Sequence, residues 1–277
     1  MPELPEVETT RRGVAPHVIG RRVKAVHVYD GRLRWPVPST LGEILRNQRI
    51  TAVDRRSKYL LFRSAPGSLL VHLGMTGSLG VRRIAVPDAA QLPRERHDHV
   101  DIVFEGDVLL RYHDPRRFGS MLWLPAGDAL HPLLAALGPE PFDAGFDAAY
   151  LHRVTRGRRA AIKVALMDNH LVTGVGNIYA NEALFRAGIR PALPAGRLSL
   201  ARAGRLVDAV REVLTEAIAK GGSTLRDYVA ADGRPGDFQL DYAVYGREGA
   251  DCPACGAKVR VRRIGQRSSF FCQACQR

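Results

Sequence analysis

The stretch CPACGAKVRVRRIGQRSSFFCQAC, residues 252–275, holds all four cysteines of the chain in two C-x-x-C pairs. Two such pairs can place four thiolates tetrahedrally around Zn²⁺, with Zn–S distances of about 2.3 Å, and the residues between them fit a β-hairpin. Because four thiolates complete the coordination, we predict one structural Zn²⁺ held by Cys252, Cys255, Cys272 and Cys275. Two disulfides are the competing interpretation, and a reducing cytosol disfavours them.

A cytosolic location follows from the N-terminal sequence. The first residues, MPELPEVETT, are acidic and lack the basic and apolar regions of a signal peptide. No apolar run approaches the roughly 18 residues of a membrane-spanning helix, so we predict no membrane partner.

Basic residues gather at the two ends of the chain. The 277 residues include 41 Lys+Arg and 28 Asp+Glu, so the formal charge is 41 − 28 = +13. Residues 1–131 contribute +6 (20 − 14), residues 132–251 +1 (15 − 14) and residues 252–277 +6 (6 − 0). This excess favours a polyanionic partner, with nucleic acid ahead of an acidic membrane surface. Charge alone also fits a protein that is merely basic.

The N-terminal half is predicted to be mostly β-structure. Pro2 to about Ile19 reads as a helix, with acidic residues in its first turns and Gly20 after its end. Seven short β-rich segments follow, at residues 21–29, 50–54, 58–63, 68–73, 99–105, 107–113 and 119–124. Strands without long intervening helices favour an antiparallel sandwich or barrel, which would form a first domain of residues 1–131.

Helical periodicity replaces the β-pattern after residues 125–146, which are rich in Pro, Gly and Ala and suit a linker. We predict helices over residues 158–169 and 177–188, and a third helix capped by Ser199. The third carries an apolar stripe of Ala203, Leu206, Val207, Val210, Val213, Leu214 and Ala217. Residues 221–246 read as an exposed loop. The predicted second domain is 132–246, and the zinc finger is 247–277.

The N-terminus also has a chemical interpretation. If Met1 is removed, Pro2 carries a free secondary amine, and an α-amino pKa of about 8 leaves a useful neutral fraction at pH 7. This amine can attack a sugar C1′ to give an iminium, and Glu3 can protonate a departing oxygen. Taken alone, the same residues simply suit the start of a helix.

Three further motifs are ambiguous when each is taken alone. HDPRRFGSM, residues 113–121, fits insertion of Arg and Phe into DNA, and it also fits a plain hairpin turn. HLGMTG, residues 72–77, fits a strand end with a buried Met75. Gly174 and Gly176 precede a helix and would let a phosphate approach its N-terminus, although such turns are common.

Considered in order along the chain, these motifs form a set. They are PELPEVET (2–9), SKYL (57–60), HLGMTG, HDPRRFG, VGNIYANEALF (175–185), GGSTLRDYV (221–229), VYGR (244–247) and the QRSSFFC segment between the cysteine pairs. The chain therefore resembles the bacterial formamidopyrimidine-DNA glycosylase family, also called Fpg or MutM, over essentially its whole length.

The resemblance implies an α+β multidomain fold. Its parts are an N-terminal antiparallel β-sandwich with an N-terminal helix, a helical domain with a helix-two-turns-helix motif, and a C-terminal zinc-ribbon hairpin. It also implies a monomeric, bifunctional glycosylase and abasic-site lyase acting on damaged double-stranded DNA. Such an enzyme flips and excises oxidised purines, 8-oxoguanine and formamidopyrimidines, and then cuts the strand by β- and δ-elimination.

The catalytic residues of the family match four positions here. Pro2 matches the nucleophile and Glu3 the general acid that acts on the sugar ring oxygen. Glu6 matches an acid that supports the site, and Lys58 matches a lysine that is both catalytic and in contact with phosphate.

The resemblance also implies DNA contacts. Met75, Arg116 and Phe118 match residues that fill the space left by the flipped base, with Arg116 pairing to the orphaned cytosine. Phosphate contacts are implied for His72, Lys163, Asn177, Tyr245 and Arg267. A lid over the flipped base is implied for Ser223, Thr224, Leu225, Arg226 and Tyr228, with Gly221 and Gly222 as hinges.

Two alternatives remain at this stage. An endonuclease VIII-like enzyme takes oxidised pyrimidines, but it usually begins PEGPE and lacks the Met and DPRRF insertion set, whereas this chain has Leu4 and keeps both. A non-catalytic zinc-ribbon protein that binds DNA has no reason to combine Pro2, Glu3 and Lys58. The resemblance does not decide which hairpin arginines contact DNA among Arg260, Arg262 and Arg263.

Overall fold

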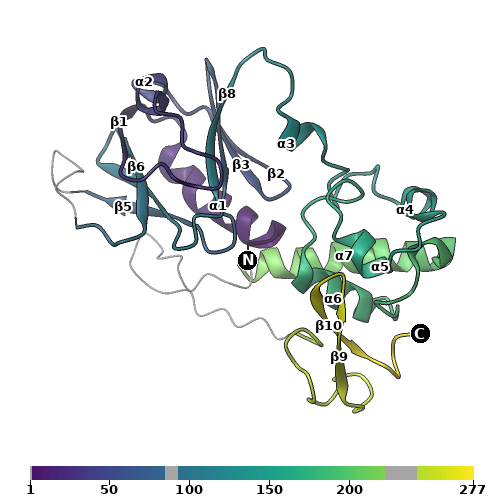
Figure 1. The fold of residues 1–277 in the computed structure, drawn as a ribbon. Helices are drawn as coiled ribbons and strands as arrows, with labels where there is room; N and C mark the ends of the chain where they lie inside the picture. Colours follow the sequence, from purple (N-terminus) through teal and green to yellow (C-terminus); the bar gives the residue numbers. More distant parts are fainter. Residues whose placement is uncertain (1, 85–92, 222–241) are drawn as a thin grey trace. The chain divides into compact units, whose positions relative to one another are not determined.

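The computed structural model describes residues 2–84, 93–221 and 242–277. These residues fall into two compact units, which are described separately (Figure 1). The first unit runs to His131, and the second contains Pro132–Lys220 and the chain after the second gap. The division into three domains stays a prediction about folding units.

Among the described residues of the first unit, eight strands form two antiparallel sheets. One sheet has the order β1-β6-β7-β5 and the other β2-β3-β4-β8. The strands are β1 (Val23–Val28), β2 (Ala52–Arg56), β3 (Tyr59–Ser64), β4 (Gly67–His72), β5 (Ser78–Arg83), β6 (Asp98–Phe104), β7 (Val108–His113) and β8 (Ser120–Pro125). The predicted antiparallel β-sandwich is confirmed, and each of the seven predicted segments overlaps a strand. The eighth, β5, was missed.

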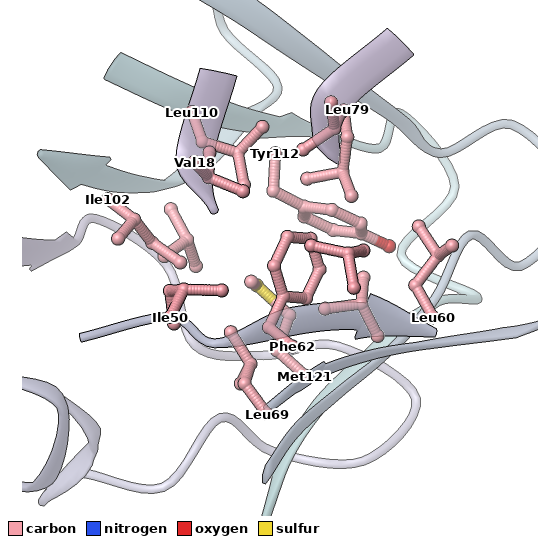
Figure 2. Close-up of a cluster of buried hydrophobic side chains, with 14 of the residues drawn as sticks. Val18, Ile50, Leu60, Phe62, Leu69, Leu79, Ile102, Leu110, Tyr112 and Met121 are labelled. Atoms are coloured by element: carbon pink, nitrogen blue, oxygen red, sulfur yellow. The ribbon is translucent and has the colours of Figure 1, made fainter. Parts of the chain in front are cut away.

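Alternating side chains of these strands build the core of the first unit. Ile102 on β6 and Leu110 and Tyr112 on β7 belong to the same buried cluster as Phe62 on β3 and Leu69 on β4 (Figure 2). In β7 the cluster takes every second residue, as expected for a strand with one face toward a core. The Tyr112 ring is fully buried, so this strand is firmly anchored where it leads into the HDPRRFG motif.

A single long helix, α1 (Leu4–Val18), packs on this sandwich and contacts strands of both sheets. Val7, Val14 and Val18 enter the core. The helix begins two residues later than predicted, because Glu3 is its extended N-cap, and Gly20 adopts φ +82° after its end. Pro2 therefore precedes the helix. A short helix, α2 (Leu41–Leu45), lies between β1 and β2 in the chain and was not predicted.

Helices and one hairpin make up the second unit. The helices are α3 (Pro132–Ala135), α4 (Ala148–Thr155), α5 (Ile162–Leu166), α6 (Asn177–Arg186), the 3₁₀ turn η2 (Ala195–Arg197) and α7 (Leu200–Ala219). The hairpin pairs β9 (Val259–Ile264) antiparallel with β10 (Arg267–Cys272). Among the described helices, none combines the length and apolar character needed to cross a bilayer.

The helix α7 confirms its prediction in detail. The Ser199 hydroxyl accepts a hydrogen bond from the Arg202 N–H at 3.3 Å, and all seven residues of the predicted apolar stripe are buried. α4 and α6 pack against this helix. The helix predicted over residues 158–169 is shorter, since only Ile162–Leu166 is helical. The α4 helix was missed.

Candidate active site and metal centre

The predicted nucleophile stands just ahead of α1. The Glu3 N–H donates to Glu6 Oε2 at 2.8 Å, which closes a capping box at the start of the helix. Both carboxyl side chains are buried, Glu3 being 1% exposed and Glu6 3%. Pro2 is itself only partly exposed. The capping box therefore fixes the backbone that immediately follows the Pro2 amine.

Lys58 lies in the tight turn between β2 and β3. The preceding residue, Ser57, is buried and adopts φ +58°, a left-handed conformation that only the surrounding contacts can hold for a non-glycine residue. The Arg55 guanidinium donates to the Ser57 carbonyl at 3.0 Å and also to Glu8 Oε2 on α1 at 3.3 Å. Arg55 thus ties the turn that carries Lys58 to the helix that follows Pro2.

Glu8 gathers several arginines around one carboxylate. It is paired with Arg11 at 2.9 Å and Arg12 at 2.8 Å, besides Arg55. Burial would raise the pKa of Glu8, but the hydrogen bonds and charges of these arginines outweigh burial and hold that pKa below its ordinary value. The carboxylate is therefore ionised at neutral pH and holds the arginines in place.

His72 ends β4 directly opposite Tyr59, and the two rings lie 4.9 Å apart. Its Nδ1 accepts a hydrogen bond from the Gly74 N–H at 3.1 Å, so this nitrogen carries no proton. Burial, with the positive charges of Lys58 and Arg34, lowers the pKa of His72 to about 4. A neutral imidazole with its N–H on Nε2 could donate to a phosphate without adding charge.

The predicted insertion residues project from two loops of the first unit. Phe118 is 42% exposed, Arg116 is exposed and Met75 is partly exposed. The Arg116 guanidinium lies over the Phe118 ring, 4.6 Å from its centre. The loops themselves are joined, since the Thr76 hydroxyl donates to Asp114 Oδ1 at 2.8 Å. The structure therefore brings the two motifs together.

In the second unit, Asn177 is the first residue of α6 and follows Gly174, which has φ +83°. The helix N-terminus thus has the glycine turn predicted for it. Arg267 is exposed at the start of β10, and Arg260, Arg262 and Arg263 lie on β9, where all three are exposed.

Lys163 joins α5 to the hairpin. Its side chain has no exposed surface, and its ammonium donates to the Ser268 carbonyl and the Ser269 hydroxyl of β10, each at 2.7 Å. These bonds use two of the three N–H donors of the ammonium. The phosphate contact of Lys163 stays a prediction.

Two neighbouring residues of α6 support the C-terminal segment and were not predicted. The buried Glu182 carboxylate accepts hydrogen bonds from the backbone N–H groups of Ala243, Val244 and Tyr245 at 2.8–3.0 Å. The Asn181 side chain accepts from the Phe270 N–H at 2.8 Å. Tyr245, predicted to contact phosphate, is partly exposed and stacks edge-on with Phe270, their ring centres 5.3 Å apart.

The four cysteines converge at the base of the hairpin. Their sulfur atoms all lie within 4.8 Å of one another, with Cys252 Sγ 3.9 Å from Cys275 Sγ and Cys255 Sγ 3.5 Å from Cys272 Sγ. Four ligands at about 2.3 Å in a tetrahedron lie about 3.8 Å apart, whereas a disulfide requires about 2.05 Å. The arrangement fits a metal ion such as Zn²⁺ and excludes the disulfide alternative.

The predicted lid lies outside the described residues. Ser223, Thr224, Leu225, Arg226 and Tyr228 all fall in the second gap, as does the hinge residue Gly222.

Comparison with known proteins adds to this geometry. Residues 1–121 match the family model of the formamidopyrimidine-DNA glycosylase N-terminal domain, and residues 137–229 match its H2TH domain. A curated formamidopyrimidine-DNA glycosylase of Alkalilimnicola ehrlichii is 58% identical over the full length of both chains, and one of Methylococcus capsulatus is 57% identical, also over both full lengths. The chain belongs to the formamidopyrimidine-DNA glycosylase family.

Solved structures of the family share the fold. The crystal structure of MutM (Fpg) from Thermus thermophilus is 45% identical with a TM-score of 0.83, covering 99% of this chain and 98% of that one. Lactococcus lactis Fpg bound to DNA containing an N7-benzyl-Fapy-dG is 32% identical with a TM-score of 0.88 over the whole of both chains. The chain is thus a DNA-binding glycosylase of DNA repair.

Proposed function

We propose that this glycosylase excises oxidised purines, 8-oxoguanine and formamidopyrimidines, from duplex DNA and then cleaves the abasic strand. Pro2 would be the nucleophile, Glu3 the general acid, Glu6 the supporting acid and Lys58 the lysine that contacts the phosphate. The observation that carries the proposal is the pair of hydrogen bonds from Arg55 to Glu8 and to the Ser57 carbonyl. These bonds join the helix α1, which follows Pro2, to the turn that presents Lys58.

The chemistry follows from a secondary amine beside a buried carboxyl group. The Pro2 nitrogen attacks C1′ with its lone pair, and the bond from C1′ to the base breaks as the base leaves with the electron pair. The proton that the Pro2 nitrogen then loses neutralises the departing base. The C1′–O4′ bond then opens while Glu3 gives a proton to O4′, which leaves an iminium between Pro2 and C1′. Loss of a C2′ proton expels the 3′-phosphate, and a second elimination expels the 5′-phosphate.

The damaged base has to leave the stack before this attack, because C1′ is not reachable from within an intact duplex. Met75, Arg116 and Phe118 would fill the vacated space. The exposure of Phe118 and its stacking under Arg116 support this role, since an aromatic wedge and a guanidinium are presented together. His72, Asn177, Tyr245 and Arg267 would contact phosphates. We also propose that the chain acts as a monomer.

One Zn²⁺ held by Cys252, Cys255, Cys272 and Cys275 would be structural. A closed set of four thiolates leaves no position for water or substrate, so the ion would stabilise the hairpin rather than take part in the reaction. The hairpin would then present Arg267 and its neighbours to the DNA backbone.

Borohydride trapping tests the nucleophile directly. A duplex with 8-oxoguanine opposite cytosine should give a reduced covalent adduct whose peptide maps to Pro2 of the unsubstituted protein. A protein that keeps Met1 or an N-terminal tag should give none, because its Pro2 nitrogen is an amide. An adduct on a lysine would contradict the assignment, and the absence of both adduct and strand scission would favour a non-catalytic DNA-binding protein.

The same assay separates the two candidate substrate classes. Under the same conditions, duplexes carrying an oxidised pyrimidine should be processed more slowly than duplexes carrying 8-oxoguanine. A reversed preference would favour the endonuclease VIII-like alternative.

A further inference from the structure

We propose that Asp114 is a positioning residue that joins the Leu73–Gly77 and Asp114–Gly119 loops into one rigid insertion element. By fixing these loops together, Asp114 would set how the enzyme reads the base opposite the lesion. The inference rests on the proposed function, because it assigns a support to residues that would enter the duplex.

The Asp114 carboxylate binds both loops at once. One oxygen, Oδ1, accepts from the Thr76 hydroxyl at 2.8 Å and from the Arg116 N–H at 3.3 Å. The other oxygen, Oδ2, accepts from the Gly119 N–H at 2.9 Å. Asp114 has no exposed surface, so water does not compete for these bonds, and hydrogen bonds to a buried carboxylate are among the stronger ones in proteins.

The loops are also pressed together backbone against backbone. A Cβ on Gly74 would lie 2.5 Å from the Gly119 nitrogen and 2.5 Å from the Phe118 carbonyl carbon, and Gly74 has φ +64°. This close approach leaves little freedom for one loop to move without the other. It also explains the glycine in the LGMTG motif on grounds of space and conformation.

The joined loops are fastened to the core of the first unit. The Tyr112 ring lies within the buried cluster (Figure 2). Its hydroxyl is 3.3 Å from Asp114 Oδ2. A Cβ on Gly119 would lie 1.7 Å from that hydroxyl, so the loop closes directly onto the tyrosine. His99 Nε2 lies 2.8 Å from the Asp114 carbonyl, which can only accept, so this nitrogen carries the proton.

Asp114 holds the backbone of Arg116 and leaves its side chain in place over Phe118. The N–H of Arg116 is bound by the carboxylate, whereas the guanidinium lies on the Phe118 ring. The turn between them is tight, since Arg117 adopts φ +57°. The two exposed side chains therefore project from a backbone whose position Asp114 determines, while Asp114 itself is buried and out of reach of DNA.

Two substrates should depend differently on the insertion element: a single-stranded abasic site and a damaged base in a duplex. An abasic site in a single strand has no opposite base and no vacated space in a duplex, so its cleavage needs Pro2, Glu3 and Lys58 but not the insertion residues. Excision from a duplex also needs the insertion element. A loosened element should therefore impair duplex excision and the preference for cytosine opposite the lesion, and leave cleavage of the single-stranded abasic site intact.

The test compares Thr76→Val with Thr76→Ser. Valine has nearly the shape of threonine but lacks the hydroxyl, whereas serine keeps it. We expect Thr76→Val to lower kcat/KM for duplex 8-oxoguanine opposite cytosine about tenfold, the effect of losing one hydrogen bond to a charged group. The excision rate opposite cytosine, divided by the rate opposite adenine, should move closer to one. The rate of single-strand abasic cleavage should stay within about twofold of that of the unsubstituted protein. Thr76→Ser should behave like the unsubstituted protein, and Asp114→Asn should repeat the Thr76→Val pattern more strongly.

The outcomes separate the inference from the function on which it rests. If the unsubstituted protein is active and Thr76→Val matches Thr76→Ser in rate and in opposite-base preference, the inference is wrong. Equal losses on duplex and single-stranded substrates, with a lowered melting temperature, would also overturn it, because that pattern reports general destabilisation. Failure of the unsubstituted protein to form the Pro2 adduct would instead remove the proposed function, and this inference with it.

Discussion

The two units support their candidate functional residues in different ways. In the first unit, an apolar core between two sheets fixes the strand ends, and turns such as the one at Lys58 present side chains from that frame. In the second unit, the hairpin rests on two buried polar groups, Lys163 of α5 and Asn181 of α6, while Glu182 of α6 holds residues 243–245 ahead of the hairpin. A two-stranded hairpin has too little core of its own, so it depends on a metal ion and on this polar seat.

Of the changes considered, removing the metal should have the largest effect, and it should affect the second unit and not the first. Cys272→Ala, or chelation confirmed by metal analysis, should disorder the hairpin, since binding of structural Zn²⁺ is worth about 10–16 kcal/mol in zinc-finger peptides. DNA binding should be lost, while the sandwich unit keeps its β-structure by circular dichroism. The exposed neighbour Lys258 offers a control as Lys258→Gln. Full activity in a verified metal-free protein would refute a structural metal.

The burial of His72 in the first unit should make the free energy of unfolding depend on pH in the acid range. Because burial lowers its folded-state pKa to about 4 from about 6.5, unfolding takes up a proton between these two pH values. Above pH 6.5, protonation of His72 does not affect the free energy of unfolding. As the pH falls from 6.5 toward 4, it lowers this free energy progressively, by up to about 3 kcal/mol.

Denaturant titrations at several pH values measure this contribution. His72→Gln should lose stability less steeply between pH 6.5 and 4 than the unsubstituted protein, whereas substitution of the exposed His170 should leave the slope unchanged. Parallel curves for the unsubstituted protein and His72→Gln would contradict the shifted pKa.

The polar seat of the hairpin should be sensitive to Lys163. Lys163→Met keeps the length of the side chain but leaves the Ser268 carbonyl and the Ser269 hydroxyl without their donor, at a cost of about 1–3 kcal/mol. We expect a lower stability of the second unit in chemical denaturation, and no such loss for the exposed Lys220→Met. If DNA binding by Lys163→Met depends less steeply on salt while stability is unchanged, the polar seat is refuted and the predicted phosphate contact is supported.

The sequence predicted regular elements well because their periodicity is local. The β-rich composition of β6 and β7 and the apolar stripe of α7 are visible without any tertiary information. The strand β5 was missed because Gly80 interrupts its pattern and it ends in two arginines. The helices α2, of five residues, and α4, of eight residues, are too short for a helical period to be visible in the sequence.

Supporting residues were harder to predict than the groups they support. Asp114 and Glu182 are acidic residues that a sequence alone would place at the surface, yet both are buried. The Thr76 hydroxyl of another loop donates to Asp114, and backbone N–H groups of residues 243–245 donate to Glu182. Their partners are set by tertiary contacts, which no local pattern records. The nearest signal was their position inside the DPRRFG and NIYANEALF motifs. Lys163 shows the same effect, since no local pattern indicates its hydrogen bonds to Ser268 and Ser269 of the hairpin.

The smallest expected effect belongs to a residue that the hairpin merely presents. Arg267 is exposed at the start of β10, so Arg267→Gln should leave folding unchanged and remove one phosphate contact. The slope of log K against log salt for DNA binding should then flatten by about one unit, equally for damaged and undamaged duplexes. The exposed Arg205 on α7 provides a control of the same charge as Arg205→Gln. An equal flattening in both variants would show that net charge, rather than the position of Arg267 on the hairpin, governs the slope. An unchanged slope for Arg267→Gln would show that this residue does not contact a phosphate.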